Sequence, residues 1–249
     1  MENSFKRVVE KCYKCNSGYF SQLLISLVLL FIFRPYDRGA IYTGIWEVLF
    51  IVVFLSAIFN CDHSKKVKLA ASLFAIPALI IHWIQSISPN PIYAIIFLFL
   101  TIIFIFITTT SIIKRVVLNA RVRMETLKGV VCAYFMVAFG FAFIYYLLDL
   151  IHPGSFHADF FNSEVVSHSR YLSEMMYFSF VTLLCIGYGD IIAVQDVGQT
   201  FVILEGIIGQ FYIAILVSRL VSVYSFFEHK LHLVSKDQKE NSGKEDPPT

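Results

Sequence analysis

The sequence predicts an all-α membrane protein with six transmembrane helices and one further apolar segment that enters the membrane without crossing it. Of the 249 residues, 57% are hydrophobic and 15% are charged, and the mean hydropathy is +0.69, which is too apolar for a soluble domain. Apolar runs of about 20 residues, the length that crosses a bilayer, recur along the chain. The charged residues gather in the intervals between these runs.

The six runs that are long enough to span a bilayer are residues 19–33, 40–60, 67–87, 91–113, 129–151 and 197–227. The first run is the shortest, and we expect Gly18 and Arg34 at its two interfaces, with the arginine snorkelling toward the headgroups. Residues 175–192 are also apolar, but Gly187 and Gly189 interrupt them before they could span. Such a segment is predicted to be re-entrant, with its irregular backbone enclosed by protein.

Basic residues indicate the orientation of these spans. The intervals before the first span, after the second and after the fourth are rich in lysine and arginine, whereas the alternate intervals hold few. Since lysine and arginine accumulate on the cytoplasmic side, both termini are predicted to be cytoplasmic. The small size and short loops suit a multi-pass protein of the plasma membrane, and a net charge of +2 predicts no nucleic-acid partner.

The charge pattern also divides the chain into segments. Residues 1–18 form a polar cytoplasmic N-terminus, and residues 19–113 form a four-helix transmembrane domain. Residues 114–128 place apolar side chains at helical spacing between basic ones, which predicts an amphipathic linker helix at the inner membrane surface. Residues 129–227 form a second, two-span domain, and the lysine- and glutamate-rich residues 228–249 are expected to be a disordered cytoplasmic tail.

The most informative motif reads TLLCIGYGD at residues 182–190, between the short apolar segment and the last span. Gly187 and Gly189 tolerate backbone angles that are closed to other residues, so the backbone can point successive carbonyl oxygens to one side. Carbonyl oxygens arranged around a common axis can replace the water shell of a cation. Asp190 would add a carboxylate where such a pathway opens to the outside.

Residues 171–224 resemble the pore of tetrameric potassium channels, with a pore helix, a TVGYG-type filter and an inner helix. The resemblance implies passive conduction of K⁺ by a homotetramer in the lipid bilayer, because one chain supplies only one quarter of a filter. It implies K⁺ as the permeant ion, and no cofactor. The filter residues whose backbone carbonyls would bind K⁺ are Cys185, Ile186, Gly187, Tyr188 and Gly189, with Asp190 at the outer mouth.

The same resemblance assigns roles around the filter. Thr182 and Tyr177 correspond to pore-helix residues that support the filter, and Gly209 lies where the inner helix often has a hinge glycine. An equal alternative is that Gly206 and Gly209 allow close helix packing. The residues expected to line the cavity below the filter are Gln210, Ile213 and Val217.

Departures from the family pattern bear on ion selectivity. Cys185 stands where the family usually has threonine, and a thiol is a poor ligand for a hard cation. The string LCIGYG is similar to the filter of hyperpolarisation-activated, cyclic-nucleotide-gated channels, which discriminate poorly between K⁺ and Na⁺ but usually lack the following aspartate. A weakly selective cation channel is therefore an alternative to a potassium channel, because filter chemistry sets this ratio.

Other departures concern support and gating. Tyr177 and Phe178 replace the usual tryptophan pair of the pore helix, and of the two only the tyrosine can donate a hydrogen bond. The fourth span has no arginines at three-residue spacing, so no voltage sensor is expected. A non-conducting subunit that keeps the pore fold is a second alternative. An enzyme is not expected, since no nucleophile with a base, phosphate loop or catalytic metal set is apparent.

Ionisable residues within the apolar runs are further candidates, namely Glu47, Asp149 and Glu205. Glu205 lies one helical turn before Gly209, and it is expected either to bond to the pore helix or to tune the potential of the cavity. The structural role is favoured, because buried carboxyl groups usually need a partner.

Metal and proton sites are only weakly indicated. Cys12, Cys15, Cys61 and His63 could form a cytoplasmic zinc site, but free thiols are favoured because the second half is not a proper ligand pair. The external loop carries histidines that could sense protons, although a solvated loop is favoured. A separate regulatory partner is compatible with the sequence.

Overall fold

The computed structural model describes residues 19–34, 40–60, 65–87, 90–118, 124–158 and 168–242. In these ranges every long element is a helix, two strands have two residues each, and turns or extended chain join them, which confirms the all-α prediction. The elements are α2 (Tyr19–Ile32), α3 (Ala40–Asn60), α4 (Lys65–Ile87), α5 (Pro91–Leu118), α6 (Met124–Ile151), β1 (Phe156–His157), α7 (His168–Leu183), β2 (Ile192–Ala193) and α8 (Asp196–Ser242). Four helices, α4, α5, α6 and α8, contain stretches long and apolar enough to cross a membrane, and α2 and α3 are shorter apolar helices.

The helices lie where apolar runs predict them, and the differences concern the polar segments. The predicted amphipathic linker is not a separate helix among the described residues: α5 continues to Leu118, and α6 begins at Met124. Helix α8 continues to Ser242, whereas the tail from residue 228 was expected to be disordered. Charged residues such as lysine and glutamate are good helix formers, and residues 228–242 contain neither glycine nor proline. The last seven residues, 243–249, lie outside the described residues.

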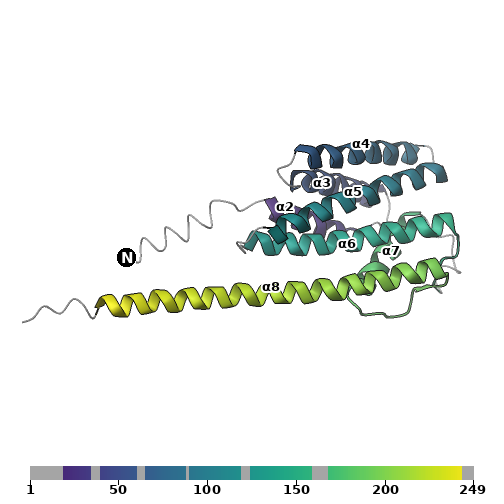
Figure 1. The fold of residues 1–249 in the computed structure, drawn as a ribbon. Helices are drawn as coiled ribbons and strands as arrows, with labels where there is room; N and C mark the ends of the chain where they lie inside the picture. The colour runs from purple at the N-terminus through teal and green to yellow at the C-terminus, as the bar shows by residue number, and fades with distance from the viewer. Residues whose placement is uncertain are drawn as a thin grey trace, which may run out of the picture. The chain divides into compact units, whose positions relative to one another are not determined.

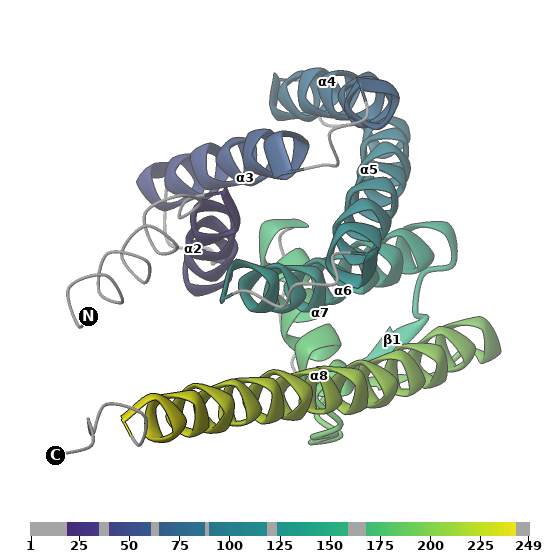
Figure 2. The same ribbon diagram turned by 60° about the vertical axis from the view of Figure 1, so that its left-hand side comes forward.

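Contacts within the chain separate a unit that ends at Gly209 from the remainder of α8, which begins at Gln210. In the first unit α5 packs against α4 and α6, and α2 packs against α3 and α6 (Figure 1). Helix α7 lies beside α6, away from α4 (Figure 2). The four N-terminal helices are therefore joined to the C-terminal helices chiefly through α6.

An aromatic cluster fills the space between α3, α5 and α6. The rings of Phe54 and Phe104 stack with centroids 4.2 Å apart, and Phe50 lies 6.0 Å from Phe97 and 6.1 Å from Phe143. Large rings in close contact gain dispersion energy, which drives helix association where lipid removes the hydrophobic contribution. This cluster attaches the N-terminal helices to α6.

Helix α2 follows α6 along its length. Near one end, Lys128 Nζ donates to Ser21 Oγ at 2.6 Å, and Cys132 Sγ donates to the Phe20 carbonyl oxygen at 3.6 Å. Near the other end, the Phe31 ring lies 6.3 Å from that of Phe135 and 4.5 Å from that of Phe180. Helix α2 therefore reaches α7 directly.

The segments on either side of α7 are joined by the strand pair. Phe156 pairs with Ala193 and His157 with Ile192, and Val194 N donates to the Ser155 carbonyl oxygen at 2.9 Å. Asp149 Oδ1 accepts hydrogen bonds from the amides of Gly154 and Ser155 at 3.1 and 3.0 Å. The strand pair therefore brings the chain that follows α6 beside the chain that precedes α8.

Candidate functional site

The backbone after α7 alternates in handedness. Cys185, Gly187 and Gly189 have φ angles of +55°, +60° and +78°, and Cys185 is the one residue other than glycine with positive φ in the described chain. Alternation between left- and right-handed residues turns successive carbonyl groups toward the same side of an extended segment. Glycine adopts this conformation freely, whereas a residue with a β-carbon is strained by about 1–2 kcal/mol. Cys185 therefore holds a conformation that its side chain disfavours.

The N-terminal end of this segment is anchored to the last turn of α7. The amides of Leu184, Cys185 and Ile186 donate to the carbonyl oxygens of Phe180, Thr182 and Val181 at 3.0, 2.9 and 2.9 Å. These bonds satisfy carbonyls that a helix C-terminus otherwise leaves without partners. From α6, Tyr134 Oη donates to the Leu183 carbonyl oxygen at 3.1 Å. Thr182 thus contacts the segment through its backbone.

The C-terminal end of the segment is held by Asp190. The Tyr177 hydroxyl donates to Asp190 Oδ2 at 2.7 Å, and the Ile191 amide donates to Asp190 Oδ1 at 3.1 Å. Partial burial, the hydrogen bond and the charge of Asp190 raise the pKa of Tyr177 to about 12. The phenol therefore keeps its proton at neutral pH and acts as the donor.

Arg34, two residues beyond the end of α2, joins this group of side chains. Its guanidinium carbon lies 5.6 Å from the centroid of the Tyr177 ring, within the range of a cation–π contact. The sequence predicts only that this arginine reaches toward headgroups, because no local pattern relates residues 34 and 177. The fold adds Arg34 to the site.

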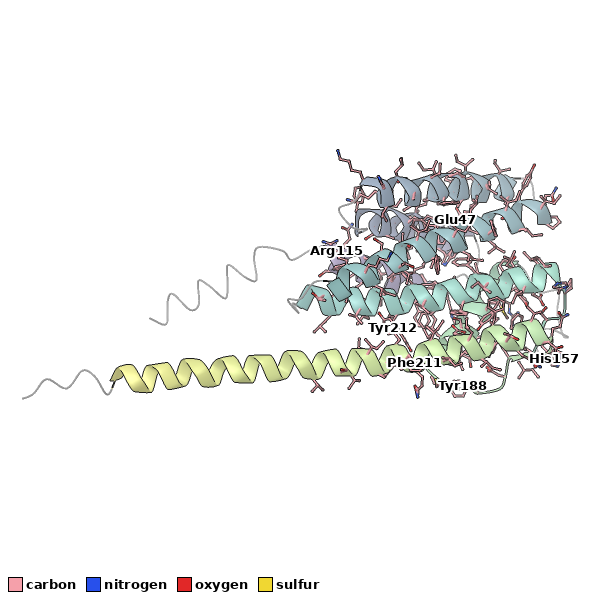
Figure 3. All side chains as sticks on the ribbon, in the orientation of Figure 1. Glu47, Arg115, His157, Tyr188, Phe211 and Tyr212 are labelled. Atoms are coloured by element: carbon pink, nitrogen blue, oxygen red, sulfur yellow. The ribbon has the colours of Figure 1, made fainter. Side chains whose placement is uncertain are left out.

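Large apolar side chains of the segment and of α8 are exposed on the single chain. Leu184, Ile186 and Tyr188 are 46%, 48% and 69% exposed, and Tyr188 is labelled in Figure 3. On α8, Val197, Ile203, Leu204 and Ile207 are also exposed. An apolar surface of this kind at the end of a buried helix marks an interface with another chain or with lipid.

Helix α8 contacts the rest of its unit through Glu205 and Gly209, among other residues. Between Gln199 and Gly209, the buried residues are Glu205 and Gly209. A β-carbon on residue 209 would overlap the Leu183 carbonyl oxygen, whereas one on Gly206 would meet nothing within 4 Å. Glu205 accepts a hydrogen bond from the Tyr145 hydroxyl at 2.5 Å, and its second carboxyl oxygen lies 2.5 Å from Ser179 Oγ. Glu205 therefore has the structural partners that the sequence favours.

The remaining candidates fall outside this group. Gln210, Ile213 and Val217 belong to the second unit of the chain, so their role in a cavity stays a prediction. Glu47 lies on α3, away from Tyr188 (Figure 3). The suggested zinc ligands Cys12, Cys15, Cys61 and His63 lie outside the described residues. Among residues that the structure describes, no three His, Cys, Asp or Glu side chains gather as a metal site.

Comparison with known proteins agrees with this geometry. A family model described as "Ion channel" matches residues 132–226, which cover most of α6, all of α7, the alternating segment and part of α8. Protein LctB of Bacillus caldotenax is 33% identical over 110 residues, which are 43% of this chain and 78% of LctB. No solved structure is a significant match. The chain belongs to this ion channel family, and it is accordingly a multi-pass membrane protein and not an enzyme.

Proposed function

We propose that the chain is a subunit of a potassium channel that conducts K⁺ passively through a filter built from residues 185–189. The observation that carries the proposal is the alternating backbone at Cys185, Gly187 and Gly189, between a half-length helix and a spanning helix. Copies of such a segment around one axis supply rings of carbonyl oxygens, and these replace the water shell of K⁺. Asp190 concentrates cations at the outer mouth.

The assembly is a homotetramer with six spans per subunit and both termini in the cytoplasm of a plasma-membrane protein. One chain supplies a single filter segment, so a closed ring requires further copies. The exposed Leu184, Ile186 and Tyr188 support this assembly, since neighbouring subunits would cover them. The basic residues between the spans support the orientation.

Residues around the filter have separate roles in this proposal. Thr182 and Tyr177 support its two ends, through the Thr182 carbonyl oxygen and the Tyr177 hydroxyl. Gln210, Ile213 and Val217 line the cavity. The close approach of Gly209 to Leu183 favours a packing role for this glycine over a hinge.

A weakly selective cation channel is the second candidate, and Cys185 is the observation that favours it. The residue at the base of the filter offers a thiol where a hydroxyl would coordinate the innermost ion.

The test is the reversal potential of the purified protein in planar bilayers under a K⁺-to-Na⁺ gradient, with Cys185→Thr as the comparison. A wild-type value near the K⁺ equilibrium potential supports the potassium channel. A value near zero that Cys185→Thr moves toward K⁺ supports the weakly selective pore. Absence of current in both proteins, at verified incorporation, would indicate the non-conducting alternative.

A further inference from the structure

Glu205 joins three helices of the pore region at one buried point. Its carboxyl group lies in α8, Tyr145 reaches it from α6, and Ser179 reaches it from α7. Glu205, Ser179 and Tyr145 are all buried, and the carboxyl group is fully shielded from solvent. Glu205 is therefore placed to hold the inner helix against the helix that carries the filter.

The hydrogen atoms available at this point can be counted. Ser179 Oγ lies 2.7 Å from the Ala138 carbonyl oxygen and 2.5 Å from Glu205 Oε1. A serine hydroxyl has one proton to donate, and a backbone carbonyl can only accept. The bond to Ala138 uses that proton, so the short contact between Ser179 and Glu205 needs a proton on the carboxyl group.

A protonated Glu205 satisfies every contact. Its own proton goes to Ser179 Oγ, the serine proton goes to Ala138, and the tyrosine proton goes to Glu205 Oε2. If Glu205 were ionised, only the serine and tyrosine protons would remain for the three contacts, Ser179 to Ala138, Ser179 to Glu205 and Tyr145 to Glu205. The carboxylate would also be a buried charge. Among the described residues its contacts are hydroxyl groups, with no basic side chain to offset that charge.

The titratable groups near Glu205 do not change this count. From α6, Tyr145 and Tyr134 face it, and Tyr134 is bonded to the Leu183 carbonyl oxygen. Cys185 follows α7, and its Sγ lies 3.9 Å from the carbonyl oxygen of Gly206. Helix α7 presents the Ser179 hydroxyl. The two phenols and the thiol would each carry negative charge if ionised and would oppose ionisation of Glu205, whereas the serine hydroxyl stays neutral.

We propose that Glu205 is a neutral carboxylic acid that positions the filter by fastening α8 to α6 and α7. Gly209, which is also buried and lies one helical turn after Glu205, contacts the end of α7 at Leu183. The two residues therefore hold the same face of α8 against the rest of the protein. This inference rests on the proposed function only for the ion-flux test, because that test needs a conducting channel. The protonation state is a property of the protein whether or not it conducts.

The first test is infrared spectroscopy of the full-length protein in lipid bilayers at neutral pH. The difference spectrum of wild type minus Glu205→Gln should contain the carbonyl band of a protonated carboxyl group. Tyr145→Phe should shift this band, because the carbonyl oxygen loses its donor, and Glu47→Gln is the control that leaves it in place. A difference spectrum that contains only carboxylate bands would overturn the proposal.

The second test is ion flux with graded replacements. Glutamine can donate to Ser179 and accept from Tyr145, so Glu205→Gln should keep flux within about twofold of wild type. Glu205→Ala should lower flux or tetramer yield roughly tenfold or more, since the buried hydroxyls lose their partner. Equal loss in both variants would overturn the neutral-acid proposal. A protonated-carboxyl band in a wild-type protein without flux would overturn only the proposed function.

Discussion

Gly209 on α8 and Leu183 at the end of α7 approach so closely that no β-carbon fits between them. A β-carbon at residue 209 would overlap the Leu183 carbonyl oxygen and lie 3.2 Å from Leu183 Cδ1. Because backbone yields less readily than a side chain, Gly209→Ala should displace α8 from the pore helix and cost about 1–3 kcal/mol per subunit. We expect a lower melting temperature of the purified tetramer and reduced K⁺ flux from liposomes.

Gly206→Ala is the matched control for this prediction. Gly206 lies on the same helix, and a β-carbon there would meet nothing within 4 Å of the same chain. Equal loss of stability in the two variants would contradict the packing role. A hinge at Gly209 predicts a different result, namely unchanged melting of Gly209→Ala with altered channel opening.

The filter glycines give a second prediction. Gly187→Ala should abolish K⁺ selectivity, because a left-handed φ of +60° with a β-carbon costs about 1–2 kcal/mol in each subunit. Gly154→Ala is the control, since Gly154 has a φ of +83° in the loop before β1 and also has no neighbour within 4 Å. It should lower stability by a similar amount while leaving the reversal potential unchanged. Unaltered selectivity of Gly187→Ala would argue against residues 185–189 as the filter.

The thiol of Cys185 gives a third prediction. Among the described cysteines, Cys185 is exposed and Cys132 is buried. With Cys12, Cys15 and Cys61 replaced by serine, a small cationic thiol reagent should block flux by labelling Cys185, because only an accessible thiolate reacts. Cys185→Ser should be resistant, and Cys132→Ser should remain sensitive. Block that persists in Cys185→Ser would place the reactive thiol elsewhere.

Arg34 and Tyr177 give a fourth prediction, which tests whether the residue that follows α2 stabilises the proposed filter. Tyr177→Phe removes the hydrogen bond to Asp190 and should cost about 1–3 kcal/mol in filter stability, measured as faster loss of current during sustained K⁺ conduction. Arg34→Gln removes the cation from the Tyr177 ring and should cost about 0.5–1 kcal/mol, in the same direction.

Combining replacements of Arg34 and Tyr177 in one protein tests whether Arg34 acts through the Tyr177 ring or independently of it. If Arg34 acts through Tyr177, Arg34→Gln should add less in a Tyr177→Leu background than in the wild type, because no ring remains to be contacted. Arg34→Lys should retain part of the stabilisation that Arg34 provides, since lysine keeps the positive charge. Strict additivity of the two replacements would show that Arg34 does not support the filter.

The helix positions were predictable because they depend on runs of neighbouring residues. Membrane helices need long apolar stretches, so α3, for example, has the bounds that its apolar run predicts. The positive φ angles of Gly187 and Gly189 were predictable for the same kind of reason, because glycine is the residue that adopts them freely. The helical continuation of α8 to Ser242 was missed, because the prediction weighed charge and low hydrophobicity and overlooked helix propensity.

By itself, the sequence determined the helices and the positive φ angles of Gly187 and Gly189 after α7, because each depends on residues close together along the chain. Only the tertiary structure decided which distant residues meet. It places Arg34 against Tyr177 and Leu183 against Gly209. It also brings both Tyr145 and Ser179 within hydrogen-bond distance of Glu205. These contacts depend on how helices pack, and packing of apolar helices is set by the shapes of many side chains together rather than by any local pattern.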